Sequence, residues 1–257
     1  MQRSNFSVVT EAEVTKINLT SDKKMATGVT FIDSNGDTGE QPADIVVSAT
    51  FTLDNTRLLL LSGIGKPYNH QTGEGTVGRA FSFQTLSYGF MFFENEYLNP
   101  FMNAGALAVQ IDDFNGDNFD HTGLGFIGGA GIQSLSNTGL PIGMTGLLPD
   151  GAPQWGKGWK KAFTHAYQNW AMIQGQGTGY AHRDQFMDLD PTYKDRFGRP
   201  LLRITYYYNE NDRRSGRLIR DKCVQLAREM GARAVNGLAL LDQSYSTSPL
   251  FDSSLVH

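Results

Sequence analysis

The segment ADIVVSATFTLDNTRLLLLSGIG, residues 43–65, decides the fold class. Its residues 44–49 form a short and nearly continuous apolar run, which is typical of a strand buried on both faces, like the central strand of a parallel sheet. Asp54 or Asn55 can cap a helix through residues 56–61, and the glycine that follows can end it. A strand, a tight turn, a helix and a glycine in this order predict an α/β domain.

The amino-terminal side of this segment favours strands. Residues 6–14 and 28–32 are rich in β-branched side chains. The sequence SNGD at 34–37, directly after the second run, is a strong turn signal. A small antiparallel sheet is therefore expected before residue 43.

On the carboxyl-terminal side, the amino-acid composition changes near residues 80–90. Aromatic strand candidates fill residues 81–93, and a region rich in Gly and Asn follows to about residue 158. Residues 200–208 predict another strand. An amphipathic helix is predicted over 212–230, with an apolar stripe and a terminating glycine. The stripe consists of Leu218, Ile219, Cys223, Leu226, Ala227 and Met230, and Gly231 ends the helix.

Composition excludes several classes of protein. The 257 residues can bury a sizeable core, and the net charge of −4 gives no general attraction to nucleic acid or anionic lipid. No apolar run reaches the roughly 18 residues that span a bilayer. The single cysteine, Cys223, excludes an internal disulfide, and its place on the helix stripe predicts a buried, unreactive thiol.

The spacing of Gly123, Gly125 and Gly128 matches G-x-G-x-x-G. A nucleotide-binding loop of this type needs an apolar strand before it and a helix after it. The preceding residues DDFNGDNFDHT are polar, and the following residues QSLSNTGLPIG contain Gly and Pro where the helix should run. A glycine-rich loop or strand crossing is expected instead.

Metal and hydrolase motifs are also missing from the sequence. The DDFNGDNFD stretch does not place its ligands at EF-hand positions, and solvated Asx turns are expected there. The five histidines form no zinc-binding pair, and no G-x-S-x-G elbow is present. No metal site is predicted.

Residues 43–65 and the sequence GEGTVGRAFSFQT at 73–85 resemble a known family. Together these segments resemble the second signature region of the glucose–methanol–choline (GMC) oxidoreductases, which are FAD-dependent. The matching residues are Leu58, Leu59, Ser62, Gly63, Ile64 and Gly65. The departures are Phe51, where glycine is usual, Asn55 and Thr56. With FMDLDPTYKDRFGRPLLRITY at 186–206, the chain most resembles the flavoprotein subunits of membrane-bound sugar dehydrogenases, such as gluconate 2-dehydrogenase.

The resemblance implies a mixed α+β or α/β fold in two parts. Residues 1–88 are expected to form a partial FAD-binding domain, Rossmann-like with a β-meander. Residues 89–257 are expected to form a substrate-binding domain with an antiparallel sheet and flanking helices. The amino-terminal nucleotide motif and the carboxyl-terminal catalytic segment of the family are expected to be missing, so that the chain is a fragment without tight FAD binding of its own.

Site residues follow from the resemblance one position at a time. Val14 matches the family valine whose backbone meets the adenine of FAD. Ala49 and Thr50 match the small residues that let the backbone approach the cofactor. His257 lies near the position of the catalytic histidine. In the family, that histidine removes the hydroxyl proton of a sugar, sugar acid or polyol while hydride passes to flavin N5.

The resemblance also implies partners and a location. A cytochrome c subunit and a small subunit of a membrane-bound dehydrogenase complex would hold the protein at the periplasmic face of the inner membrane. Two alternatives stay open. The chain can be a non-catalytic, truncated remnant, or it can be a β-rich carbohydrate-binding domain, as its three tryptophans suggest. These are Trp155, Trp159 and Trp170.

Overall fold

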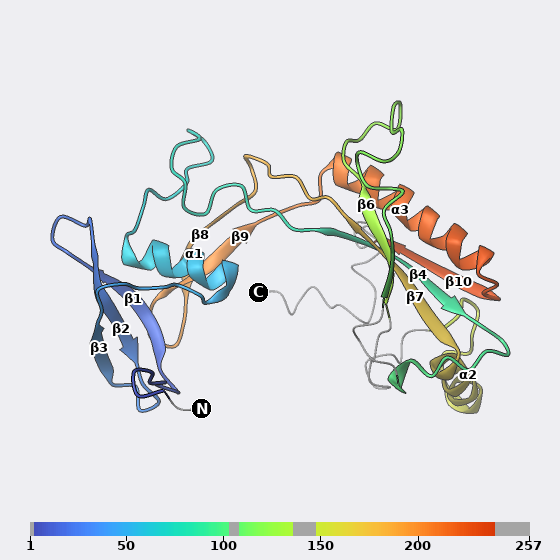
Figure 1. Cartoon of the computed structure of the whole chain (residues 1–257), viewed down its shortest axis with the longest axis horizontal. Coiled ribbons are helices and arrows are strands. Elements are labelled where there is room, and N and C mark those ends of the chain that lie inside the picture. Colours follow the sequence, from blue (N-terminus) through green and yellow to red (C-terminus); the bar gives the residue numbers. More distant parts are fainter. Residues whose placement is uncertain (1–2, 103–107, 136–147, 240–257) are drawn as a thin grey trace. The chain divides into compact units, whose positions relative to one another are not determined.

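The computed structural model describes residues 3–102, 108–135 and 148–239 of the chain (Figure 1). The chain divides into two compact units, and each is described here by itself. The first unit comprises residues 1–82 and 181–207, and the second comprises residues 83–180 and 208–257. The sequence predicted a single boundary after residue 88, whereas residues 181–207 lie in the first unit.

The first unit contains a three-stranded antiparallel meander, as expected. Its strands are β1 (Glu13–Leu19), β2 (Ala26–Ile32) and β3 (Thr38–Pro42), paired in that order. The turn between β2 and β3 closes on Asp33, whose Oδ1 accepts hydrogen bonds of 2.9 Å from the backbone N–H groups of Asn35 and Asp37. This side-chain acceptor fixes the turn that the sequence SNGD predicts.

Two of the predicted strands in this unit are wrong. Residues 6–12 are not a strand, and the run at 44–49 is neither a strand nor buried, since Ile45 and Val47 are 80% and 81% exposed. An apolar run becomes a central strand only when neighbouring strands satisfy its backbone groups on both sides. Among the described residues no strand pairs with either segment.

Helix α1 (Phe51–Ser62) begins earlier than the sequence predicts. Asn55 does not cap it from outside; its Oδ1 accepts hydrogen bonds from the Thr50 N–H at 3.0 Å and the Thr50 hydroxyl at 2.8 Å, from within the first turns. Gly63 adopts a left-handed conformation with φ of 66° and ends the helix, which confirms that prediction. The helix packs on β1 and on the hairpin of β8 (Phe186–Lys194) and β9 (Pro200–Thr205).

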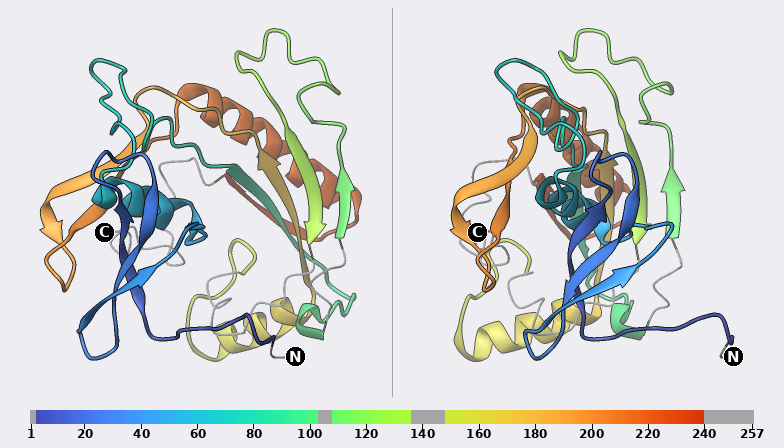
Figure 2. Two further views of the ribbon diagram at one scale, coloured as in Figure 1. Left: turned by 60° about the vertical axis from the view of Figure 1, so that its left-hand side comes forward. Right: turned by 90° about the vertical axis from the view of Figure 1, so that its left-hand side faces the viewer.

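The second unit is built on a five-stranded antiparallel sheet in the order β10-β4-β7-β6-β5. The strands are β4 (Thr85–Phe92), β5 (Ala108–Ile111), β6 (Ala130–Leu135), β7 (Trp170–Gly177) and β10 (Ala234–Ala239). Helix α3 (Glu210–Glu229) lies along one face of this sheet (Figure 2). Helix α2 (Gly156–Gln168) precedes β7, and a short 3-10 helix, η1, covers Pro100–Met102.

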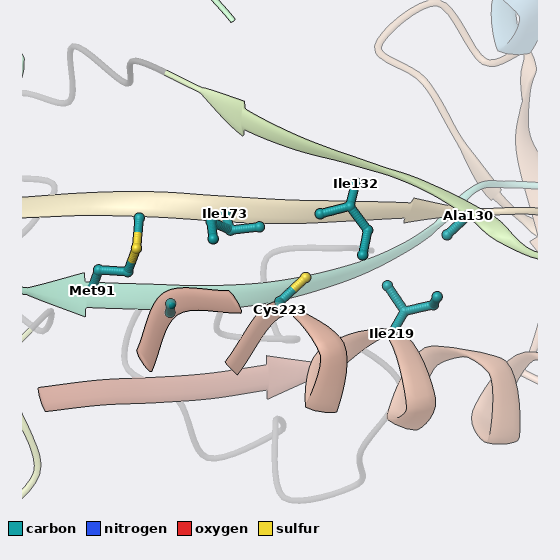
Figure 3. Close-up of a cluster of buried hydrophobic side chains, with 7 residues drawn as sticks. Met91, Ala130, Ile132, Ile173, Ile219 and Cys223 are labelled. Atoms are coloured by element: carbon teal, nitrogen blue, oxygen red, sulfur yellow. The ribbon is translucent and has the colours of Figure 1, made fainter. Parts of the chain in front are cut away.

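The main core of the second unit lies between the sheet and α3. Met91, Ile132 and Ile173 from the sheet meet Ile219 and Cys223 from the helix (Figure 3). Cys223 is fully buried, as predicted, and burial raises the pKa of its thiol to about 12, which disfavours the reactive thiolate.

The close approach of helix and sheet requires glycine in β4. A Cβ on Gly89 would lie 2.9 Å from the carbonyl oxygen of Cys223. Met230, predicted on the buried stripe, is 56% exposed because α3 ends at Glu229. The glycine-rich loop at 123–128 leads into β6 and not into a helix, as expected.

These antiparallel sheets with few helices confirm the predicted mixed fold. Within the described ranges, no helix is both long and apolar enough to cross a lipid bilayer.

Candidate cofactor pocket

A pocket of about 380 Å³ opens in the first unit between the start of β1 and helix α1. Val14 and Thr50, for which the resemblance implies cofactor binding, line it together although 36 positions separate them. Ala49 is exposed and is not part of the lining, and His257 lies outside the described residues. The complete lining is Ala12, Glu13, Val14, Thr50, Asp54, Arg57, Leu58, Leu61 and Arg199.

The α1 side of the pocket is shaped by an unusual start to the helix. Phe51 has a positive φ of 73° and its ring is 73% exposed. A left-handed conformation disfavours residues with a side chain, so the backbone here keeps a geometry suited to glycine. Glycine is the residue that the resemblance places at this position. The turn directs Thr50 toward the pocket.

The opposite end of α1 is fastened to β1, which fixes the two walls relative to each other. The Ser62 hydroxyl donates to the Leu58 carbonyl at 2.6 Å and accepts from the Ile17 N–H at 2.9 Å. Ser62 is buried, so these hydrogen bonds satisfy groups that are removed from water.

An ion-pair cluster forms the charged side of the pocket. Arg57 Nη2 lies 2.7 Å from Asp195 Oδ2, and Arg199 Nη2 lies 2.8 Å from the same oxygen. Arg199 also pairs with Glu13. The side chains of Arg57, Asp195 and Arg199 are only 14–17% exposed. We call Glu13, Arg57, Asp195 and Arg199 the arginine cluster.

Electrostatics keeps Asp195 ionised. Burial opposes its charge, but hydrogen bonds from Arg57 and Arg199 and from the backbone N–H of Phe197 outweigh burial and hold the pKa of the Asp195 carboxyl far below its usual range. The same carboxylate accepts the Arg199 N–H at 2.9 Å and so closes the turn between β8 and β9. One side chain therefore both shapes the hairpin turn and holds two pocket arginines.

The pocket presents a mixed set of polar groups. The Thr50 hydroxyl donates to Asn55, which leaves its oxygen as an acceptor, while Glu13 and Asp54 contribute carboxylates and Val14, Leu58 and Leu61 contribute apolar contact. Such a lining suits a ligand with an apolar ring and several donors. No group of three or more possible metal ligands occurs in the described residues.

The arginine cluster was not predicted from the sequence. The signal was present in part, because Asp195 and Arg199 both belong to the DRFGRP turn and stand four residues apart. Their pairing with Arg57, 138 positions away from Asp195, is a tertiary contact that no local pattern predicts.

The three tryptophans of the second unit do not share one surface. Trp170 is buried in β7, and the Trp159 ring stacks on Phe163 at 5.4 Å. Trp155 is 86% exposed at the start of α2. Trp170 is therefore not accessible to a carbohydrate, whereas the exposed Trp155 and the half-buried Trp159 lie four residues apart at the start of α2.

Comparison with protein families and curated proteins gives a consistent result. The family model described as GMC oxidoreductase matches residues 1–85. A gluconate 2-dehydrogenase flavoprotein of Pantoea cypripedii is 41% identical over 244 residues, which cover 92% of this chain and 38% of that protein. A 2-methyl-1,2-propanediol dehydrogenase of Mycolicibacterium austroafricanum is 27% identical over 235 residues, covering 91% of this chain and 42% of the relative. The chain thus spans about two fifths of the length of these relatives.

Comparison with solved structures agrees on the fold. A formate oxidase of Aspergillus oryzae, determined in a study of FAD modification, superposes with a TM-score of 0.50 at 12% identity. The match covers 86% of this chain and 42% of the oxidase. At this identity the likeness concerns the fold alone.

Proposed function

Because this chain belongs to the GMC oxidoreductases, we propose that it is part of an FAD-dependent enzyme that oxidises a CH–OH group of a sugar, sugar acid or polyol. The observation that carries this proposal is the pocket of the first unit, where Val14 and Thr50 line one space. The family resemblance implies a cofactor role for both positions. Ala49, exposed beside Thr50, belongs to the same proposed backbone approach.

The pocket residues fit part of FAD. The pocket volume of about 380 Å³ lies at the lower end of the range for small-molecule sites, which suits one portion of a dinucleotide. Val14 and Leu61 can pack against a planar ring. Glu13 and Thr50 can accept hydrogen bonds from amino or hydroxyl groups. The described residues contain no glycine-rich turn that opens a helix to hold pyrophosphate.

FAD, when bound, supplies the two-electron acceptor for the oxidation. The described residues bind and orient it: β1 and α1 place Val14 and Thr50, and the arginine cluster keeps this wall in position. By resemblance, His257 is proposed to remove the proton of the substrate hydroxyl. Imidazole suits that role because its pKa lies close to neutral pH.

Partners are proposed on the same basis. The full-length protein is expected to act on a small-molecule substrate and to pass electrons to partner subunits, one of them a cytochrome c, at the periplasmic face of the inner membrane. Co-purification of the tagged full-length protein with a haem-containing subunit in the membrane fraction tests this. Recovery of the whole protein from the soluble fraction, free of haem, would contradict it.

Ligand-observed NMR of the purified chain with FAD and with AMP tests the cofactor pocket. We expect weak, reversible binding of both ligands and a loss of at least about tenfold in affinity for Val14→Trp, because the indole fills the pocket. Val9→Trp is the control, since Val9 is 72% exposed and is not part of the lining. Absence of binding at millimolar ligand, or binding that survives Val14→Trp, would exclude the pocket as a cofactor site.

A further inference from the structure

Helix α2 of the second unit carries lysines on the side that faces away from the core (Figure 1). The residues of its inner side that pack against the core are Trp159, Ala162, Phe163 and Ala166. Lys157, Lys160 and Lys161 are exposed on the opposite side. Positions three and four residues apart are neighbours on a helix, so the three ammonium groups gather on one surface. We call these three lysines the lysine face.

The lysine face is not neutralised within the part of the chain that the structure describes. The lysines that form ion pairs there, Lys24 and Lys66, belong to the first unit. The sequence of α2 contains no acidic residue. Like charges four positions apart do not stabilise a helix, so the fold alone does not account for this grouping. A partner with negative charge does account for it.

The segment beside α2 adds little negative charge. The carbonyl of Glu94 lies 3.0 Å from Nε2 of His165, which places this segment next to the helix. The Glu94 carboxylate pairs with Arg233. Among the described residues 94–102, this leaves the exposed Glu96 as the only carboxylate without an ion pair. The three lysines therefore outweigh it.

An exposed tryptophan directly precedes the helix. Trp155 has an extended backbone with φ of −159°, and the residue is 86% exposed. Its ring stacks on no residue that the structure describes. Tryptophan is usually well buried in a folded chain, but it is enriched at membrane interfaces, where its ring is apolar and its N–H is polar. Trp155 lies two positions before Lys157, so the aromatic ring and the charges adjoin.

The type of cation favours lipid over an acidic protein as the partner. Arginine matches a protein carboxylate with a rigid fork of donors, as Arg57 and Arg199 do at Asp195. Lysine is a compact, hydrated charge on a flexible stem, which suits a layer of mobile headgroups. The net charge of −4 does not cancel this local attraction, because charges are screened beyond about 8 Å at physiological ionic strength.

We propose that the lysine face and Trp155 bind the anionic headgroup layer of a lipid bilayer. Each lysine near such a surface raises affinity about fivefold, and Trp155 adds apolar contact at the interface. This goes beyond attachment through partner subunits, because the chain itself contacts the lipid. It does not depend on the proposed oxidation.

Co-sedimentation of the purified chain with unilamellar vesicles tests the proposal. We expect binding at millimolar lipid to vesicles of phosphatidylcholine and phosphatidylglycerol in equal parts. Affinity should fall at least about tenfold with phosphatidylcholine alone and in high salt, because both remove the electrostatic attraction. Combining Lys157→Gln, Lys160→Gln and Lys161→Gln should cause a similar loss.

The matched control combines Lys16→Gln, Lys23→Gln and Lys24→Gln. These lysines are exposed in the first unit, so the control changes the net charge equally and should keep vesicle binding. A second readout is tryptophan fluorescence, which should shift to shorter wavelength with the anionic vesicles. Trp155→Ser should abolish that shift, since Trp170 is buried in the core.

The outcomes distinguish this inference from the proposed function. No binding to the anionic vesicles, or equal losses in the two lysine variants, overturns the lysine face. Binding to poly-L-glutamate without binding to the vesicles assigns the surface to an acidic protein and overturns the lipid. A fluorescence shift that survives Trp155→Ser overturns the role of Trp155. Far-UV circular dichroism checks that the variants are folded, and FAD binding at the Val14 pocket in the same samples bears on the proposed function alone.

Discussion

Phe51 departs from the family pattern in its side chain, while its backbone has the left-handed conformation that suits the usual glycine. The resemblance places glycine there, and the observed φ of 73° is the conformation for which glycine is favoured. The ring is 73% exposed, so it gains little by packing. Phe51 therefore carries a conformational cost at the edge of the pocket.

Phe51→Gly is expected to stabilise the chain by about 0.5–1 kcal/mol. A residue with a Cβ in the left-handed conformation is strained by about 1–2 kcal/mol, and glycine removes this strain. Glycine also makes the unfolded chain more flexible, which offsets part of the stabilisation. Urea denaturation followed by far-UV circular dichroism measures the change. Phe51→Ala removes the same ring but keeps a Cβ at positive φ, so it should not stabilise; equal gains in both variants would point to the ring as the cause.

At the scale of elements, the arginine cluster holds the β8–β9 turn against α1. Arg57 donates to Asp195 and also, from Nε, to the Pro200 carbonyl at 3.0 Å, so it contacts both sides of the turn. Removing one partner of a largely buried pair leaves the other charges uncompensated.

Asp195→Asn is expected to lower the free energy of unfolding by about 2 kcal/mol at pH 7, because Arg57 and Arg199 lose their shared carboxylate. The folded-state pKa of Asp195 is depressed, so the stabilisation is present above the ordinary aspartate pKa near 4 and is lost as pH falls further. Chemical denaturation between pH 7 and pH 3 measures both effects. The loss in Asp195→Asn relative to the parent chain should shrink toward low pH.

Asp190→Asn in β8 is the matched control. Asp190 is half-buried and accepts the backbone N–H groups of Thr192 and Tyr193, which an asparagine oxygen can also accept. Its change in the free energy of unfolding should be small compared with that of Asp195→Asn. An equal loss in both variants would assign the effect to the hairpin as a whole and not to the ion pairs.

Elements that depend on local signals were predicted well from the sequence. The stop of α1 at Gly63 follows from a glycine at the helix end, and α3 follows from its apolar stripe. The Asn209 cap that starts α3 at Glu210 was not predicted. The predicted strand at 44–49 failed because a buried strand is defined by its neighbours, which a local pattern does not contain. Val14 and Thr50 were found through a resemblance, while the pairing of Arg57 with Asp195 depends on contacts across the fold.

At the scale of the whole molecule, the two units differ in their buried apolar content. The second unit contains both of the described core clusters, with Met91, Ile132, Ile173 and Cys223 almost fully buried. The buried apolar residues of the first unit are few: Ile17, Leu58, Tyr68, Phe186 and Met187. Since burial supplies most of the stabilisation, the first unit should open more readily.

Native-state hydrogen exchange is expected to show this difference. Amides in the central strands β4 and β7 should be protected at least about tenfold longer than those in β1 and β2, in line with a difference of about 1.4 kcal/mol in opening free energy. Added FAD should slow exchange in β1 and α1 and leave β4 and β7 unchanged, since a ligand stabilises the part that binds it. Equal protection in all strands would show that the units open together.

The extended segment at 44–49 affects how the chain behaves in concentrated solution. Its main-chain N–H and C=O groups are not paired with any described strand, and Ile45 and Val47 face water. Such an edge can serve as a template for the same segment of a neighbouring molecule. Ile45 and Val47 should therefore promote association between molecules in concentrated solution, and a lysine introduced at position 47 should reduce aggregation.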